Sequence, residues 1–114
     1  MNKVILLGRL GAAPEFKALK DKSVCTFNVA TSEKWVKNGD NQERTEWHKV
    51  VVWDKLAEIC NKYLAKGSQV LIEGKLQTRH FEDVSGQKRY ITEIVAHSVQ
   101  FLDSKSSEDG GLPL

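Results

Sequence analysis

The chain has 114 residues, 40% of them hydrophobic and 28% charged, with a formal net charge of +2. This length fits one domain with a single modest core and excludes two such domains. Residues 103–114 hold three acidic side chains and one lysine, so residues 1–102 keep 16 basic and 12 acidic side chains, a net charge of +4. A moderately basic body favours an anionic partner, although many soluble domains carry such a charge.

The first expected element is a strand at residues 4–10, in which Gly8 indicates a bend or a close approach of another backbone. Its apolar run of four residues is too short for a signal-peptide core or a membrane span, so a bacterial-type cytoplasmic location is expected. A second strand is expected at residues 23–35. A polar hairpin tip containing Asn38-Gly39 leads from it to a third strand at residues 45–53.

An amphipathic helix is expected next, with Asp54 as its N-cap and Gly67 at its end. Two more strands are expected at residues 68–81 and 89–102, joined by a polar turn. Three strands, one helix and two strands is the order of an OB-fold, a five-stranded, partly open Greek-key barrel. The fold class predicted is therefore all-β, with one α-helix between strands 3 and 4.

This OB-fold domain is expected to occupy residues 1–102. Residues 103–114 are small and polar, with two glycines, and they predict a flexible acidic tail.

The third strand, TEWHKVVVW, has an unusual outward face. Alternate side chains of a strand share a face, so Trp47, Lys49 and Trp53 lie on one side and His48 on the other. A core would exclude the lysine, and a plain wet surface seldom carries two indoles. The fourth strand repeats the pattern in its second half, with the alternating residues Lys75, Gln77, Arg79 and Phe81.

Flat rings interleaved with cations suit a polymer in which bases alternate with phosphates. Unpaired bases stack on aromatic rings at about 1–3 kcal/mol per base, and the phosphates between them bind Lys or Arg. The pattern therefore predicts binding of single-stranded nucleic acid with little sequence preference. Each ring taken alone could equally be a core or interface aromatic, and the parity shared with the cations is what favours the binding face.

Two residues do not fit this face. Trp35 shares its parity with the apolar residues Cys25, Phe27 and Val29, so strict alternation would bury it, and only a bulge or a coil in the strand would bring it to the open face. His48 is interpreted as a histidine with a satisfied hydrogen bond in the core or in a subunit contact.

Enzymatic activity is not expected. The sequence has no nucleophile beside a base, no paired carboxylates and no phosphate-binding glycine loop. Cys25 and Cys60 lack a CxxC spacing and clustered histidines, which favours two buried free thiols over a disulfide or a metal site. Neither a metal nor another cofactor is expected.

Four stretches resemble the bacterial single-stranded DNA-binding protein family: NKVILLGRLGAAPE, FNVATSEKW, TEWHKVVVWDKLAEICNKYLAKGSQVLIEGKLQTR and SGQKRYITEIVA. The match is collinear over about residues 1–102. It implies an OB-fold chain, usually assembled as a homotetramer, that coats single-stranded DNA in replication, recombination and repair. It also implies a location on the nucleoid in the bacterial cytoplasm. The preference for DNA over RNA rests on the resemblance alone, since rings and lysines accept either polymer.

By position, the resemblance implies base stacking on Trp35, Trp47, Trp53 and Phe81. The family often has Phe where Trp53 stands and Trp where Phe81 stands, and both exchanges keep a π-face. The resemblance implies phosphate contacts by Lys3, Lys49, Lys55, Lys66 and Arg79, and the alternation pattern adds Lys75. Gln77 stands where a basic residue is common. His48 matches a position at the family's subunit interface.

The C-terminus departs most from the family, whose members carry a Gly-, Pro- or Gln-rich linker and an acidic tip that recruits replication and repair proteins. This chain ends in GGLPL, with Glu108 and Asp109 near its end, so a truncated or degenerate tip is expected. Two other interpretations stay open. One is an OB-fold adaptor of the primosome-accessory type, although such proteins keep few stacking rings, and the other is an organellar homologue.

Overall fold

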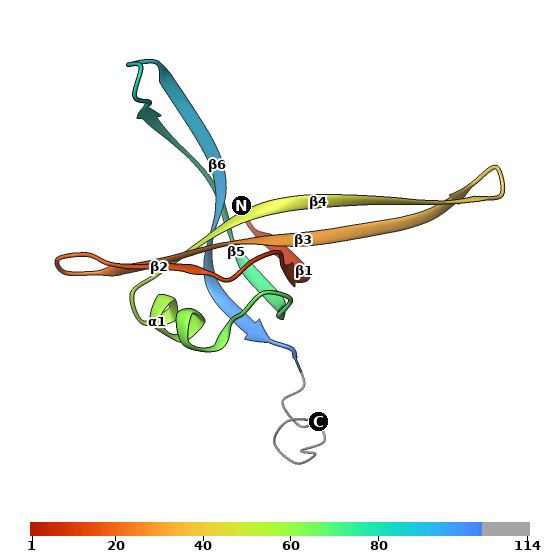
Figure 1. Ribbon diagram of the computed structural model, residues 1–114, viewed down its shortest axis with the longest axis horizontal. Coiled ribbons are helices and arrows are strands. Elements are labelled where there is room, and N and C mark those ends of the chain that lie inside the picture. The colour runs from red at the N-terminus through yellow and green to blue at the C-terminus, as the bar shows by residue number, and fades with distance from the viewer. Residues whose placement is uncertain (104–114) are drawn as a thin grey trace, which may run out of the picture.

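The computed structural model describes residues 1–103, which form six strands and one helix (Figure 1). In chain order they are β1 (Val4–Leu10), β2 (Glu15–Ala18), β3 (Ser23–Lys37), β4 (Asp40–Trp53), α1 (Asp54–Tyr63), β5 (Gln69–Glu82) and β6 (Lys88–Phe101). The tail expected at residues 103–114 lies, apart from Asp103, outside the described residues.

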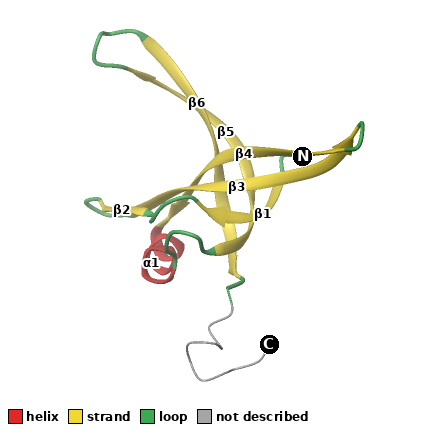
Figure 2. Ribbon diagram, turned by 45° about the vertical axis from the view of Figure 1, so that its right-hand side comes forward, coloured by secondary structure: helices red, strands yellow, loops and turns green. Residues whose placement is uncertain are grey.

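The strands form one sheet in the order β1-β5-β6-β4-β3-β2, and a further pairing of β1 with β3 closes the five longer strands into a barrel (Figure 2). The pairs are antiparallel except β4 with β6, which is parallel. The helix follows the third of the five barrel strands. The predicted five-stranded OB-fold is therefore confirmed.

The sequence pattern did not predict β2. This strand pairs with the start of β3, from Glu15 opposite Thr26 to Ala18 opposite Ser23. Four residues offer too few alternations to be recognised as a strand, and the pairing with β3 is what makes them one. Together, β2 and the turn after it place three further side chains, described below, near Trp53 of β4.

The core fills the barrel and continues under α1. Its largest fully buried side chains come from β3, β4, β5 and the helix: Cys25, Val29, Val50, Val52, Cys60, Val70 and Ile72. Both cysteines are free and buried, as predicted. Burial, followed by the nearby Cys25, raises the pKa of the Cys60 thiol to about 12, so this thiol stays protonated near neutral pH.

Two long hairpins, β3–β4 and β5–β6, project from the barrel (Figure 1). Within the barrel one face of β3 is buried, but from Glu33 onward every residue of the strand is exposed. In β5 the same change occurs between the buried Gly74 and the exposed Lys75. The outer half of each hairpin therefore presents both of its faces.

The tip of the β3–β4 hairpin is the predicted Asn38-Gly39 turn. Both residues have positive φ, 52° and 81°, as this type of two-residue turn requires. The turn pairs Lys37 with Asp40, so β4 begins at Asp40 and not at residue 45 as the pattern predicted.

The two predicted ends of the helix were wrong. Asp54 has a φ of +56°, and its Oδ1 accepts a hydrogen bond of 3.3 Å from the backbone N–H of Ser23. The N-cap position is Trp53, which has no side-chain capping bond, and the helix ends at Tyr63. Gly67, with a φ of +89°, instead directs the chain back to the barrel, where its N–H donates to the carbonyl of Leu10. Among the described residues, no helix is long and apolar enough to cross a membrane.

Gly8 is the close backbone approach that the sequence indicated. A Cβ built on Gly8 would collide with the carbonyl oxygen of Ala30 on β3. Because β1 and β3 close the barrel next to this point, at Arg9 opposite Ala30, a side chain at position 8 would push the closing strands apart.

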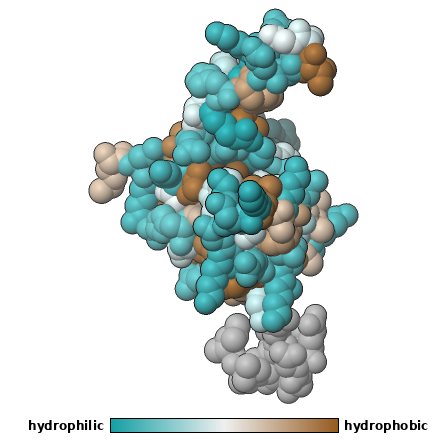
Figure 3. Space-filling view, turned by 90° about the vertical axis from the view of Figure 1, so that its left-hand side faces the viewer, coloured by the Kyte–Doolittle hydropathy of each residue, from teal (hydrophilic) through white to brown (hydrophobic). Residues whose placement is uncertain are grey.

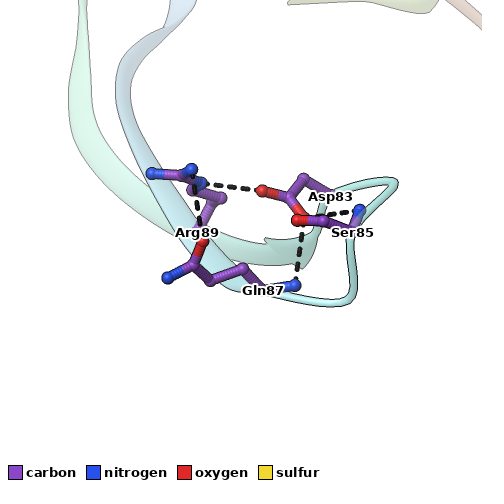
Figure 4. Close-up of polar contacts among 4 residues, drawn as sticks. All are labelled: Asp83, Ser85, Gln87 and Arg89. Carbon is purple, nitrogen blue, oxygen red and sulfur yellow. Dashed lines mark hydrogen bonds and ion pairs between the residues drawn. The ribbon is translucent and has the colours of Figure 1, made fainter.

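The tip of the β5–β6 hairpin is held by one carboxylate (Figure 4). Asp83 accepts hydrogen bonds from the hydroxyl and N–H of Ser85, from the N–H of Gln87 and from Nε of Arg89, at 2.7, 3.0, 2.9 and 2.9 Å. The bonds from Ser85 and Arg89, followed by the Gln87 N–H, lower the pKa of Asp83 to about 2. This exposed tip is therefore ordered by its own hydrogen bonds.

Candidate nucleic-acid interface

The outward faces of β3, β4, β6 and β5 form one continuous surface. Directly opposed residues share a face, and the register sets Ala30 opposite Trp47 and Gln77 opposite Glu93. The parallel pair Val51 with Val95 places Lys49, two residues earlier, level with Glu93. These rows place the cations and rings of β4 and β5 on one side of the sheet, which we call the sheet face. Its residues are Trp47, Lys49, Trp53, Lys75, Gln77, Arg79 and Phe81.

The three aromatic rings of the sheet face are exposed. The relative exposure is 58% for Trp47, 39% for Trp53 and 44% for Phe81. Figure 3 shows a hydrophilic surface broken by separate hydrophobic patches, with no single continuous apolar area in that view. Separate rings between polar groups suit individual bases better than one broad protein contact.

Trp47 and Trp53 are each held in place by a neighbour. The ring of Trp47 lies against Gly11, where a Cβ would come within 2.5 Å of Cζ3. The ammonium of Lys22, in the turn between β2 and β3, lies 5.1 Å from the centroid of the Trp53 ring. Both rings therefore have one side restricted and another available for stacking.

A groove of about 530 Å³ lies next to Trp53. Apolar side chains line part of it, namely Leu19, Val24 and Val51, and cations line another part, namely Lys17, Lys49 and Arg79. Sequence reasoning missed Lys17, Leu19 and Lys22 because it did not predict β2. The available signal was the lysine-rich run KALKDK at residues 17–22.

Glu93 lies among the cations of the sheet face and was also missed. Its side chain is 3% exposed, and Nε of Arg79 donates a 2.8 Å hydrogen bond to its Oε1. Nζ of Lys49 lies 3.8 Å from Oε2, which has no hydrogen-bond partner among residues 1–103. Three strands thus contribute to one ion cluster with a net charge of +1.

Trp35 is exposed without the predicted bulge. The register of β3 with β4 is continuous from Val24 to Lys37, and Trp35 keeps the parity of the barrel's inner face. It is 44% exposed because the hairpin has left the barrel at that point. The expectation that strict alternation would bury Trp35 was therefore wrong, and no bulge or coil brings it to the open face. Trp35 lies on the hairpin face opposite to Trp47, so the structure does not bring these two rings onto one face.

The other predicted phosphate contacts are dispersed. Nζ of Lys3 forms a 2.6 Å ion pair with Glu73, and this hydrogen bond lowers the pKa of the Glu73 carboxyl. Lys55 lies in the first turn of α1 and Lys66 in the loop after it, so neither belongs to the strands of the sheet face. Lys75, in contrast, belongs to the sheet face and is exposed on β5.

His48 points away from the sheet face and is half-buried. It shares a 2.8 Å hydrogen bond, through Nε2, with the hydroxyl of Thr31 on β3. The polar partner agrees with a satisfied histidine, and a role in a subunit contact stays a prediction.

A sequence model described as the single-strand binding protein family matches residues 1–102. The chain belongs to this family. The predicted family membership is thereby confirmed, and it covers the whole barrel and both projecting hairpins.

Individual relatives agree with this assignment. The chain is 50% identical over 113 residues to single-stranded DNA-binding protein 1 of Chlorobaculum tepidum, a match that covers 96% of this chain and 70% of that one. It is 44% identical over 115 residues to the single-stranded DNA-binding proteins of Neisseria meningitidis serogroups A and B, covering 99% of this chain and 66% of each of those. The chain thus spans 66–70% of the length of these relatives.

A solved structure shares the fold. The structure described as Plasmodium falciparum SSB complex with ssDNA superposes with a TM-score of 0.81 at 37% sequence identity. The alignment covers 90% of this chain and 96% of that one, so the likeness extends over nearly the whole fold.

Proposed function

We propose that this chain binds single-stranded DNA without regard to sequence, and that it coats and protects strands exposed in replication, recombination and repair. The observation that carries the proposal is the sheet face, where exposed rings alternate with cations on two strands. The names of the relatives support DNA as the polymer. The function is one of binding, and no catalytic step is proposed.

In this mechanism bases stack on the rings of Trp47, Trp53 and Phe81, while the backbone phosphates contact the cations between them. Every base has a π-face, so stacking tolerates any sequence. Lys49, Lys75 and Arg79 are the phosphate contacts best supported by position. A strand that continues around the molecule would reach the dispersed positions Trp35, Lys3, Lys55 and Lys66.

The deciding experiment is a titration of the full chain with a long oligo-thymidine, monitored by intrinsic tryptophan fluorescence. Stacked indoles are quenched, so we expect strong, saturable quenching that salt weakens, because binding releases counterions from the strand. A duplex of equal length is the control and should quench far less. Absence of quenching at high concentrations of both components would instead favour the adaptor class, in which the rings contact protein.

We also propose that the chain assembles as a homotetramer, with His48 at a subunit contact. Among residues 1–103, β1 pairs with β5 along one edge, and on its other edge only Arg9 and Leu10 are paired, with β3. The strand also exposes Ile5 at 62% and Leu7 at 56%. A free strand edge beside exposed aliphatic side chains favours self-association. Leu7→Glu should lower the mass measured by light scattering. Val84→Glu, at a hairpin tip, is the matched control, and a wild-type monomer would contradict the proposal.

Two further expectations concern the cell. Recruitment of replication and repair proteins through an acidic tail falls on residues outside 1–103 and stays a prediction. So does the location on the nucleoid in a bacterial cytoplasm. Co-purification of partners with the full chain, compared with a chain ending at residue 103, would test the first.

A further inference from the structure

An acidic side chain in the middle of a surface that binds a polyanion needs an explanation. Glu93 faces the same side as the rings and lowers the positive charge available to phosphates there. Burying a carboxylate also costs free energy unless partners compensate for the lost hydration. A neutral residue would avoid both penalties, so the contacts of this carboxylate indicate its role.

The contacts of Glu93 fix the orientation of Arg79. Its Oε1 accepts from Nε, at 2.8 Å, and so occupies the inner edge of the guanidinium. The N–H donors on the two terminal nitrogens have no hydrogen-bond partner among residues 1–103, and the Arg79 side chain is 51% exposed. The same guanidinium lies 6.0 Å from the ring centroid of Phe81. A cation held in this way presents its free donors to solvent beside a ring that can stack a base.

Glu93 also attracts a cation of β4, the strand on the other side of β6 from β5. Its second oxygen lies 3.8 Å from Nζ of Lys49, too far for a hydrogen bond but close enough for attraction. Lys49 stands between Trp47 and Trp53 in the alternation of β4. One carboxylate on β6 therefore holds a cation from each neighbouring strand.

We propose that Glu93 is a positioning residue for DNA binding, which fixes Arg79 and Lys49 where they meet the phosphates beside the stacked bases. This inference rests on the proposed function. Without the carboxylate both long side chains regain rotamer freedom, and binding must then order them. The proposal predicts that removing a negative charge from this surface weakens the binding of a polyanion.

The test is the sign of the effect of Glu93→Gln on affinity for oligo-thymidine. If Glu93 only neutralises cations, the variant loses a negative charge from this surface and binds more tightly, with a steeper salt dependence. If Glu93 positions them, affinity falls about threefold to tenfold, as a hydrogen bond between two charged groups becomes a weaker one between the Arg79 cation and a neutral amide. Glu58→Gln, an equal charge change on an exposed residue of α1, is the control.

A double-mutant cycle separates positioning from a general loss of structure. In an Arg79→Gln background Glu93→Gln should lower affinity much less, because its main partner is gone. An undiminished loss would show that Glu93 acts through the fold and would overturn the proposal. So would tighter or unchanged binding by the single variant.

A second variant covers the case in which Glu93→Gln is poorly folded. Arg79→Lys keeps the charge but loses the planar guanidinium, in which Nε bonds Glu93 while the two terminal nitrogens stay directed to a phosphate, so its affinity should fall as well. Wild-type affinity in Arg79→Lys would overturn the proposal. Wild-type protein that fails to bind oligo-thymidine would contradict the proposed function itself, whereas normal wild-type binding with a tighter Glu93→Gln variant contradicts only this inference.

Discussion

The ring of Trp47 rests on the backbone of Gly11, so closely that a Cβ there would lie 2.5 Å from Cζ3 and 2.6 Å from Cη2. Gly11 lies just after β1, and its N–H donates to the carbonyl of Asn28 on β3. The close contact between a glycine and an exposed ring fixes the plane on which a base would stack.

Gly11→Ala should therefore displace the Trp47 ring and weaken binding of oligo-thymidine, by less than the loss of the ring itself. The fluorescence titration measures this directly. The control is the same substitution in a Trp47→Ala background, where the new methyl group has no ring to displace and should change little. Equal effects in both backgrounds would show that Gly11 acts on the fold and not on the ring.

Trp47→Ala should cost about 1–3 kcal/mol of binding free energy if the ring stacks one base. A loss below a few tenths of a kcal/mol would show that the ring packs against the protein and does not stack a base. Circular dichroism checks that the variant is folded.

The loss of affinity caused by Trp35→Ala should depend on oligonucleotide length, unlike the loss caused by Trp47→Ala. Trp35 lies on the other face of the projecting hairpin, so a short oligonucleotide bound to the sheet face does not reach it. A series of increasing lengths should show wild-type affinity first and a deficit only for longer strands. A deficit already present at the shortest binding length would contradict this path.

Lys22→Gln should reduce the salt dependence of binding. Lys22 lies over the ring of Trp53, which lines the groove, so it is placed to neutralise one phosphate there. The slope of log affinity against log salt should become shallower by about 0.7, the value for one contact to a single strand. Lys62→Gln is the control, since Lys62 lies 5.4 Å from the ring of Tyr63 on the helix. Equal changes of slope in both variants would rule out a local role for Lys22.

The tip of the β5–β6 hairpin should become less ordered at acid pH. The pKa of Asp83 is lowered from 3.8 to about 2, so its ionised form stabilises the folded tip. That contribution is complete well above pH 3.8 and is lost as the pH falls through about 2. Exchange of the Gln87 amide, followed by NMR, should accelerate in that range. Above this range Asp83→Asn should exchange faster than the wild type, and it should lack the transition; an unchanged transition in the variant would assign it to another group.

Strand alternation made much of the sheet face predictable. Trp47, Lys49 and Trp53 are spaced by two, and the period of a strand is two, so their common side follows without any knowledge of neighbours. The same holds for Lys75, Arg79 and Phe81. The free cysteines were also predictable, since their surroundings are apolar and no second ligand lies near them in the sequence.

Trp35 shows where alternation stops being informative. Its parity correctly assigned it to the inner face of β3, but exposure depends on where that face stops being covered. The covering residues come from other strands and from α1, which are distant in sequence. A local pattern therefore predicts the side of a residue and not its accessibility.

The order of the long strands and the helix, the strand faces and the alternation of rings with cations can all be predicted from the sequence, because they depend on local periodicity. The contacts of Glu93 with Arg79 and Lys49, and of Lys22 with Trp53, are visible only in the folded chain. These contacts depend on the parallel pairing of β4 with β6 and on the edge strand β2. Such pairings form between segments far apart in the chain, and their energies come from neighbours that no local window contains.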